Sequence, residues 1–218
     1  MSKRPLSPQR KALDAIEEQG ALLVFPDGNR AEPPSLWKAL YPRSPMTWAW
    51  DADADGRVSK LWVLREELSR SGLVVYSKWY RGRATFFAKS SFVDLLTVLG
   101  PESMEQSLRG DAARIYELLQ ESSPRSTKEI KLETELRGKI FESAYAKAMK
   151  VLFEKGLIVG WGEVADGAFP SLACGATKNM FEDLWEKAVH QDPKQARKRI
   201  EERWNHLFIK ALGHVLKE

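Results

Sequence analysis

The sequence predicts an α+β fold of tandem winged helix-turn-helix units, the first one irregular, followed by C-terminal helices. Residues 111–174 have the spacing of three helices and then a two-stranded hairpin. Residues 8–99 contain a second alternation of helices with a hairpin, and residues 177–218 are helical in pattern. Gly100-Pro101 is the expected boundary between the units. The predicted parts are therefore 1–100, an irregular winged-helix-like unit with a basic hairpin, 101–176, a winged helix, and 177–218, a C-terminal helical segment.

The helices of the second unit have clear start and stop signals. Asp111 is expected to cap the first helix, and Ser126 with Glu129 predicts a capping box at the start of the second. A third helix is expected from about Lys139 to Lys155, with Gly156 in the place of a helix C-terminal glycine. The apolar positions are Ile130 and Leu132 in the second helix, and Phe141, Ala144, Tyr145, Ala148, Leu152 and Phe153 in the third.

A hairpin is expected to follow, with strands near residues 157–161 and 169–174 and a turn at 165–168. The stretch from Leu157 to Cys174 contains no lysine or arginine, and Glu163 and Asp166 lie near its tip. An acidic hairpin of this kind favours contact with protein rather than with DNA. One hypothesis is therefore a protein–protein interaction module.

The first half of the chain has shorter apolar segments. Gly20 is expected to end a first helix, and turns follow at 26–29 and 80–83. The elements expected here are helices at Pro8–Gln19, Leu36–Tyr41, Leu61–Ser69 and Ser90–Leu99, and strands at Ala21–Phe25, Leu73–Trp79 and Ala84–Ala88.

The hairpin of the first half is the most basic local feature of the chain. No acidic residue occurs between Glu67 and Asp94. The basic residues of this stretch are Arg70, Lys78, Arg81, Arg83 and Lys89. Arginines at a hairpin tip beside aromatic residues suit contact with phosphates or with a DNA minor groove. The alternative is a strand pair whose aromatic side chains face the core and whose arginines keep the edge soluble.

The third helix of the second unit carries Lys139, Ser143, Lys147 and Lys150 on one face. A helix that lies on DNA needs such a face, because contacts with phosphates supply most non-specific affinity. The alternative is that these side chains are simply solvated. Together with Lys78, Arg81 and Arg83, these four residues form the predicted DNA-binding set.

Composition limits the class of protein. The chain has 218 residues, a formal net charge of +4 and 43% hydrophobic residues, which is typical of a globular protein and compatible with nucleic acid. Cys174 is the only cysteine, so an intrachain disulfide is impossible. Because we find neither a signal-peptide pattern nor an apolar run of about 18 residues, we expect a cytoplasmic protein without membrane contact.

No motif predicts a metal, a cofactor or a catalytic centre. The segment Asp51-x-Asp53-x-Asp55-Gly56 matches the first half of a calcium loop, but its twelfth position is Trp62 instead of glutamate. An acidic turn is therefore favoured over a calcium site. The histidines have no partner at metal-ligand spacing, and phosphate-binding glycine loops are absent from the sequence.

Tryptophan and the C-terminal helices raise two further alternatives. The eight tryptophans are expected mostly in the core, with stacking on nucleobases as the alternative. The C-terminal segment carries a basic stretch, for which a solvated face is one interpretation, and an apolar set that can pack on the domain or form a homo-oligomer. The basic residues are Lys194, Arg197, Lys198, Arg199 and Arg203, and the apolar residues are Ile200, Trp204, Leu207, Phe208, Ala211 and Val215.

Several short phrases of the sequence occur in an order that resembles a known family. They are Pro34-Ser35-Leu36-Trp37, Leu61-Trp62 through Glu67-Leu68, Tyr76-x-Lys78-x-x-Arg81-Gly82-Arg83-x-Thr85, and Phe141-x-x-Ala144 to Leu152 leading into Leu157-Ile158-Val159. The sequence resembles short relatives of the AlkZ-type winged-helix DNA glycosylases over most of residues 20–175.

The resemblance implies tandem winged helices around a DNA-binding cleft and a link to the excision of alkylated or crosslinked bases. The catalytic motif of that family is a pair of glutamines spaced by one residue. This chain has no such pair, since its glutamines are Gln9, Gln19, Gln106, Gln120, Gln191 and Gln195. No catalytic residue is therefore carried over. The favoured function is DNA binding without catalysis, and the alternatives are a glycosylase with atypical catalytic residues and an interaction module.

Overall fold

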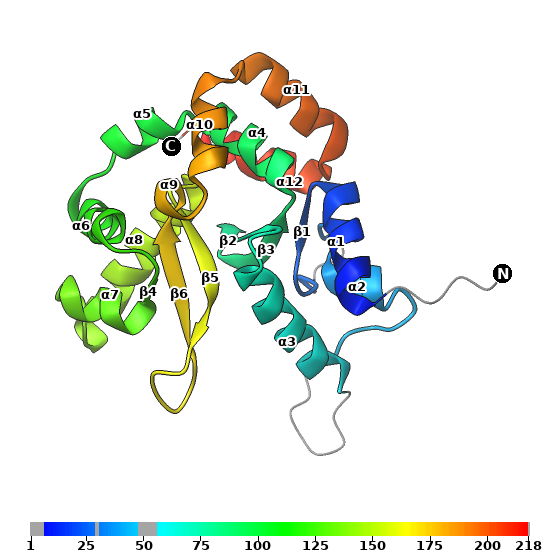
Figure 1. The fold of residues 1–218 in the computed structure, drawn as a ribbon, viewed down its shortest axis with the longest axis horizontal. Coiled ribbons are helices and arrows are strands. Elements are labelled where there is room, and N and C mark those ends of the chain that lie inside the picture. The colour runs from blue at the N-terminus through cyan, green and yellow to red at the C-terminus, as the bar shows by residue number, and fades with distance from the viewer. Residues whose placement is uncertain (1–6, 29–30, 48–55, 218) are drawn as a thin grey trace.

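The computed structural model describes residues 7–28, 31–47 and 56–217. Its strands form one six-stranded antiparallel sheet in the order β1-β3-β2-β5-β6-β4 (Figure 1). The strands are β1 (Ala21–Leu23), β2 (Val75–Tyr80), β3 (Arg83–Phe87), β4 (Arg125–Ser126), β5 (Ile158–Val164) and β6 (Ser171–Ala176).

Helices flank this sheet on both sides and cover one end of it (Figure 1). The helices of the first half of the chain are α1 (Pro8–Gln19), α2 (Leu36–Leu40), α3 (Arg57–Arg70), α4 (Lys89–Leu99) and α5 (Pro101–Gln106). The later ones are α6 (Gly110–Glu121), α7 (Thr127–Glu133), the 3-10 helix η1 (Lys139–Phe141), α8 (Glu142–Glu154), α9 (Thr177–Met180), α10 (Glu182–His190), α11 (Pro193–Arg203) and α12 (His206–Val215).

The same order of elements occurs twice along the described chain. Helix, short strand, helix, helix and hairpin run from α1 to β3 and again from α6 to β6, where η1 precedes the third helix. The sheet order mirrors this repeat, because β1-β3-β2 in one half corresponds to β4-β6-β5 in the other. The two hairpins join at the centre, where Tyr76 in β2 pairs with Gly160 in β5. Position 160 needs glycine, since a Cβ there would collide with the ring of Tyr76.

Local signals explain where several helices begin and end. The Ser126 hydroxyl accepts from the Glu129 amide at 3.2 Å, and the Glu129 carboxylate accepts from the Ser126 amide at 2.7 Å. The predicted capping box is therefore confirmed. Gly156, with a φ of 67°, follows α8 as expected for a glycine that terminates a helix.

Three expectations for these helices are wrong. Asp111 lies inside the first turn of α6, because the helix already begins at Gly110 after the N-cap residue Arg109. Leu132 is 59% exposed, so that Ile130 alone of the two apolar positions in α7 is buried. Phe141 is also exposed, since η1 precedes α8 and places this ring before the regular helical spacing starts. The buried stripe of α8 therefore begins at Tyr145.

The C-terminal helices form part of the main core. The indole of Trp204 lies edge-on to that of Trp79 in β2, with 5.7 Å between ring centroids, and Phe208 contacts Tyr80 in the same way at 5.0 Å. Ile200 and Leu212 are buried in the same cluster, and Ala211 and Val215 pack against it. These side chains therefore pack within the chain itself, which is one of the two alternatives expected from the sequence. A homo-oligomer through these helices stays a prediction.

Two further expectations concern ions and membranes. The acidic residues Asp51, Asp53 and Asp55 lie outside the described residues. Within the described part of the chain, histidine, cysteine, aspartate and glutamate side chains do not gather in threes as a metal site requires. None of the helices described is both long and apolar enough to span a bilayer.

Candidate nucleic-acid interface

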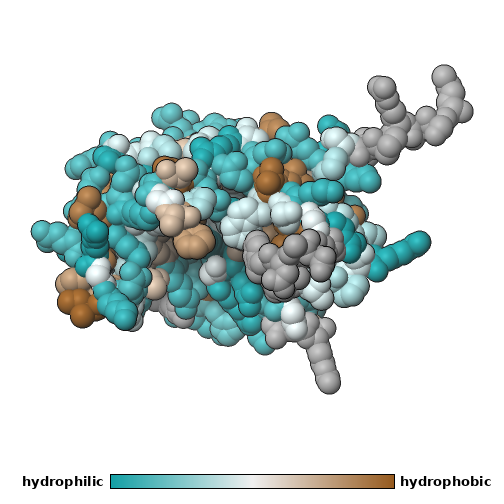
Figure 2. All heavy atoms as spheres, turned by 90° about the horizontal axis from the view of Figure 1, so that it is seen from below, coloured by the Kyte–Doolittle hydropathy of each residue, from teal (hydrophilic) through white to brown (hydrophobic). Residues whose placement is uncertain are grey.

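A cleft of about 660 Å³ lies between the two halves of the molecule. The helix α3 and the β5–β6 hairpin project in the same direction (Figure 1), and residues of both line the cleft. Viewed from this end, the surface is mostly hydrophilic, with scattered hydrophobic residues (Figure 2). The lining residues are Trp62, Arg65, Tyr76, Lys78, Gly82, Arg83, Ala84, Thr127, Lys128, Lys131, Glu163, Phe169, Pro170, Ser171 and Leu172.

Basic side chains dominate the charge of this cleft. Arg65 comes from α3, Lys78 and Arg83 come from the β2–β3 hairpin, and Lys128 and Lys131 come from α7. Among the described residues that line the cleft, Glu163 is the only acid. Five cations from three parts of the fold therefore converge on one concavity, although Lys131 also pairs with Glu142 at 2.7 Å. This positive charge suits a polyanionic ligand.

Arg65 is the buried member of this group, with only 5% of its surface exposed. Its guanidinium donates from Nη2 to Glu163 at 2.5 Å and from Nη1 to the Tyr76 hydroxyl at 3.4 Å. It also lies over the Trp62 ring, 4.3 Å from the centroid. Burial by itself would lower the pKa of Arg65, but Tyr76 and Glu163 together raise it above its ordinary value. The arginine therefore stays charged in the wall of the cleft.

Two neutral groups lie behind the basic side chains. Burial raises the pKa of Tyr76 above its ordinary value, although Arg65 opposes this shift, so the phenol stays protonated. Burial also raises the pKa of the Cys174 thiol to about 12, with Lys78 acting in the opposite direction. A fully buried, protonated thiol is a core residue and not a nucleophile.

The structure brings two of the predicted hairpin residues into the cleft and leaves out the third. Lys78 and Arg83 line it, whereas Arg81 does not. Arg81 and Gly82 have φ values of 51° and 70° and form the two-residue turn of the hairpin. The guanidinium of Arg81 lies 5.3 Å from the centroid of Tyr80, a ring that packs on the C-terminal helix α12.

The predicted face of the third helix lies outside the cleft. Lys139, Ser143, Lys147 and Lys150 are all exposed, and none of them lines it. Lys150 pairs with Glu154 at 3.7 Å along α8, and Lys147 lines a separate depression beside α6. The seven predicted residues therefore do not form one surface around this cleft.

Tertiary contacts change the charge pattern that the sequence implies. Arg83 pairs with Asp27 at 2.6 Å. An acid from another part of the chain therefore neutralises part of the positive charge of the basic hairpin. In the second hairpin, Glu163 pairs with Arg65, and Asp166 pairs with Lys128 at 3.1 Å. Both acids near the tip of that hairpin therefore have basic partners within the chain. This pairing weakens the observation that favoured an interaction module.

Several residues of the cleft are absent from the predicted set. Arg65 and Trp62 are three residues apart on α3, and Lys128 and Lys131 are three apart on α7, so each pair shares a helix face. That spacing was the available signal, but similar pairs occur on many solvated helices. Trp62, Tyr76, Lys78, Gly82 and Arg83, which belong to the family-like phrases, all meet in this cleft.

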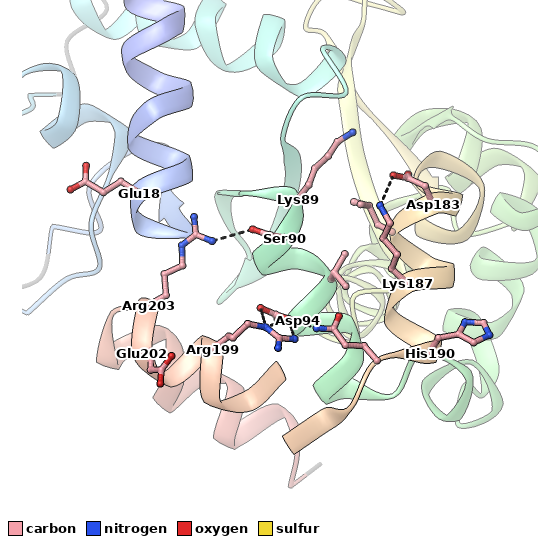
Figure 3. Close-up of a pocket in the computed structure, with 13 residues that line it drawn as sticks. Glu18, Lys89, Ser90, Asp94, Asp183, Lys187, His190, Arg199, Glu202 and Arg203 are labelled. Atoms are coloured by element: carbon pink, nitrogen blue, oxygen red, sulfur yellow. Dashed lines mark hydrogen bonds and ion pairs between the residues drawn. The ribbon is translucent and has the colours of Figure 1, made fainter. Parts of the chain in front are cut away.

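A larger cavity, of about 1000 Å³, lies at the other end between α1, α4, α10 and α11 (Figure 3). Its charged groups largely satisfy one another. Asp94 accepts from Arg199 at 2.7 and 3.0 Å and from Gln191 at 3.1 Å, and Arg203 donates to Ser90 at 3.1 Å. These contacts tie the C-terminal helices to α4, so this cavity serves the fold and lacks the excess of cations found in the cleft.

Comparisons with known proteins place the chain in one family. A search of curated proteins and a search of solved structures each found no match. A family model described as AlkZ related matches residues 7–217, nearly the whole chain. This match agrees with the family resemblance found in the short sequence phrases, and it relates the chain to DNA repair. The chain therefore belongs to the AlkZ-related family.

Proposed function

We propose that this protein binds DNA through the cleft between its two hairpins. The observation that carries the proposal is the convergence of five basic side chains, from α3, α7 and the β2–β3 hairpin, on a concavity whose described lining residues include one acid. A phosphate backbone presents regularly spaced negative charge, and its neutralisation by lysine and arginine supplies most non-specific affinity. Membership of the AlkZ-related family supports the same class of ligand.

We further propose that each half is a winged helix, with the hairpins as wings and a boundary near Gly100. The repeated order of elements and the mirrored sheet support this assignment. In that arrangement the wings β2–β3 and β5–β6 lie next to each other at the centre of the sheet. Both wings then contribute to one cleft, and α7 supplies the basic side chains that the second wing lacks.

The ion pairs of the cleft do not prevent this role. The side chains of Arg83 and Lys128 are about half exposed, whereas those of their partners Asp27 and Asp166 are only 5% and 22% exposed. Each cation can therefore present its exposed part to a phosphate while its carboxylate partner stays in place. Lys78 also lines the cleft, and the described residues provide no ion pair for it. We propose Lys78, Arg83 and Lys128 as the main phosphate-binding residues.

The predicted residues outside the cleft have a secondary place in this proposal. Arg81 at the hairpin turn and the α8 face with Lys139, Ser143, Lys147 and Lys150 are exposed. We assign them to flanking interactions with a longer duplex. Removing these side chains should weaken binding to long duplexes more than binding to short ones, because only a long duplex extends beyond the cleft.

Fluorescence anisotropy with labelled DNA tests the proposal. Wild-type binding should weaken steeply with salt, and K78A/K128A should reduce the slope of log K against log salt by about 0.9 for each phosphate that the variant no longer neutralises. The matched control is K194A/K198A on α11, which removes the same charge at exposed positions away from the cleft. Absence of binding at low salt, or equally weakened binding by both double variants, would overturn the proposal.

Base excision is a second candidate function, favoured by the position of Glu163. Among the described residues that line the cleft, this carboxylate is the one acid, and both it and the Tyr76 hydroxyl accept hydrogen bonds from the Arg65 guanidinium. General acid–base help from a carboxyl group is a common way to hydrolyse a glycosidic bond. The test is whether alkylated DNA gains abasic sites on incubation with the protein and whether Glu163→Gln abolishes that activity under conditions in which circular dichroism shows that the variant is still folded. Inactivity of the wild type across a panel of lesions would exclude this candidate.

A further inference from the structure

The cleft carries an exposed aromatic ring beside its basic residues. Phe169, in the segment that joins β5 to β6, lines the cleft and is 83% exposed. Pro170 and Leu172 continue an apolar strip along this wall. A phenylalanine in water forgoes about 1.5–3 kcal/mol that burial would supply, so a ring held at a basic concavity is suited to a ligand with an apolar face.

The α3 side of the cleft offers a second set of groups suited to a base. Trp62 is partly exposed, and the guanidinium of Arg65 lies over its ring at 4.3 Å. The Nε atom of the buried Arg65 has no hydrogen-bond partner among the described residues. A buried donor without a partner is costly in a folded protein, and a ligand acceptor that reaches it would remove that cost.

We propose that the cleft binds the bases of single-stranded DNA, with Phe169 as the stacking platform and Lys78 and Lys128 holding the phosphates. The inference rests on the proposed function and adds the class of DNA. The faces of paired bases are stacked on one another in a duplex, whereas unpaired bases stack readily on aromatic side chains. The cleft volume of about 660 Å³ lies within the range of about 300–1,000 Å³ in which pockets enclose small ligands, so a base fits inside it.

The experiment compares labelled oligothymidine of about 20 nucleotides, longer than one single-strand binding site, with a duplex of the same length. The wild type should bind the single strand more tightly than the duplex at equal salt. Phe169→Ala should weaken single-strand binding roughly tenfold or more, the effect expected for one stacked base, and leave duplex binding nearly unchanged. Phe169→Trp should retain binding, whereas Phe169→Leu, which is apolar but has no π face, should not.

The matched control is Ile140→Ala. Ile140 is also 83% exposed, but it lies in η1 outside the cleft, so its removal should leave both affinities unchanged. Duplex binding as tight as single-strand binding, or full affinity in Phe169→Ala, would overturn this inference while salt-dependent binding still supports the proposed function. Failure of the wild type to bind any DNA tested would instead refute the proposed function itself.

Discussion

Arg65 and Glu163 form an ion pair that joins the third helix of the first half to the second hairpin. The two residues are 98 positions apart, and Nη2 and Oε1 lie 2.5 Å from each other. Arg70, on the same helix, donates to the backbone carbonyl of Glu163. Contacts between α3 and β5 therefore hold two walls of the cleft together.

Breaking this pair from one side should destabilise the protein substantially. Glu163→Gln leaves the buried guanidinium of Arg65 without a countercharge, which is expected to cost about 3 kcal/mol in the free energy of unfolding. Urea denaturation measures this change. The control is Glu201→Gln, whose exposed pair with Arg197 should contribute less than about 1 kcal/mol. Equal effects of the two substitutions would show that the Arg65–Glu163 pair is solvated.

Gly160→Ala should weaken the junction of the two hairpins. The new methyl group would meet the ring of Tyr76 at the point where β2 pairs with β5. Forcing an extra carbon into a packed site typically costs about 1–3 kcal/mol, which thermal unfolding would register as a lower Tm. Gly213→Ala in α12 is the matched control, because open space surrounds that position and alanine favours a helix. A Tm unchanged by Gly160→Ala would contradict the close packing of Tyr76.

Truncation of Phe208 should unfold more than the C-terminal segment. Its ring is fully buried against Tyr80 and Trp79 of β2, so Phe208→Ala is expected to cost about 3–5 kcal/mol. Hydrogen exchange should show weaker protection in the central strands as well as in α12. If protection fell only in residues 177–217, the C-terminal helices would be an independent unit. Val63→Ala, at an exposed position of α3, should have little effect on either measurement.

The Cys174 thiol should resist alkylation in the folded protein. Its pKa of about 12 keeps it protonated at pH 8, and complete burial denies reagents access. Iodoacetamide should therefore modify it only after denaturation, as mass spectrometry would show. Burial raises this pKa above its unfolded value. The free energy of unfolding should therefore fall as the pH rises above about 8.5, because the thiol ionises in the unfolded chain and not in the folded one. Rapid labelling of the native protein would contradict the packing of this strand.

Local signals in the sequence were enough to predict most individual elements. The structure begins and ends α1 at Pro8 and Gln19 as expected, and the Ser126–Glu129 box starts α7. Such features depend on groups within about four residues of each other, so the sequence contains them directly. The errors at Asp111 and Phe141 are also local, because α6 begins two residues earlier than expected and the 3-10 helix η1 precedes α8.

The candidate site was only half predictable for the same reason. Lys78 and Arg83 stand out because they lie in one basic stretch, and both reach the cleft. The acid that meets Arg83, and the cations that meet Glu163 and Asp166, come from other elements. Their pairing depends on how the elements pack, and packing is determined by buried apolar contacts across the whole chain.

Short-range patterns in the sequence predict most of the helices, the two hairpins, the family and the basic character of the first hairpin. The pairing of β2 with β5 depends instead on packing between distant segments, because the Tyr76 ring lies where Gly160 has no side chain. That pairing places both hairpins beside one cleft and brings Arg65, Lys128 and Phe169 to the same concavity. Contacts between residues this far apart gain their stability from the folded core, which no short stretch of sequence encodes.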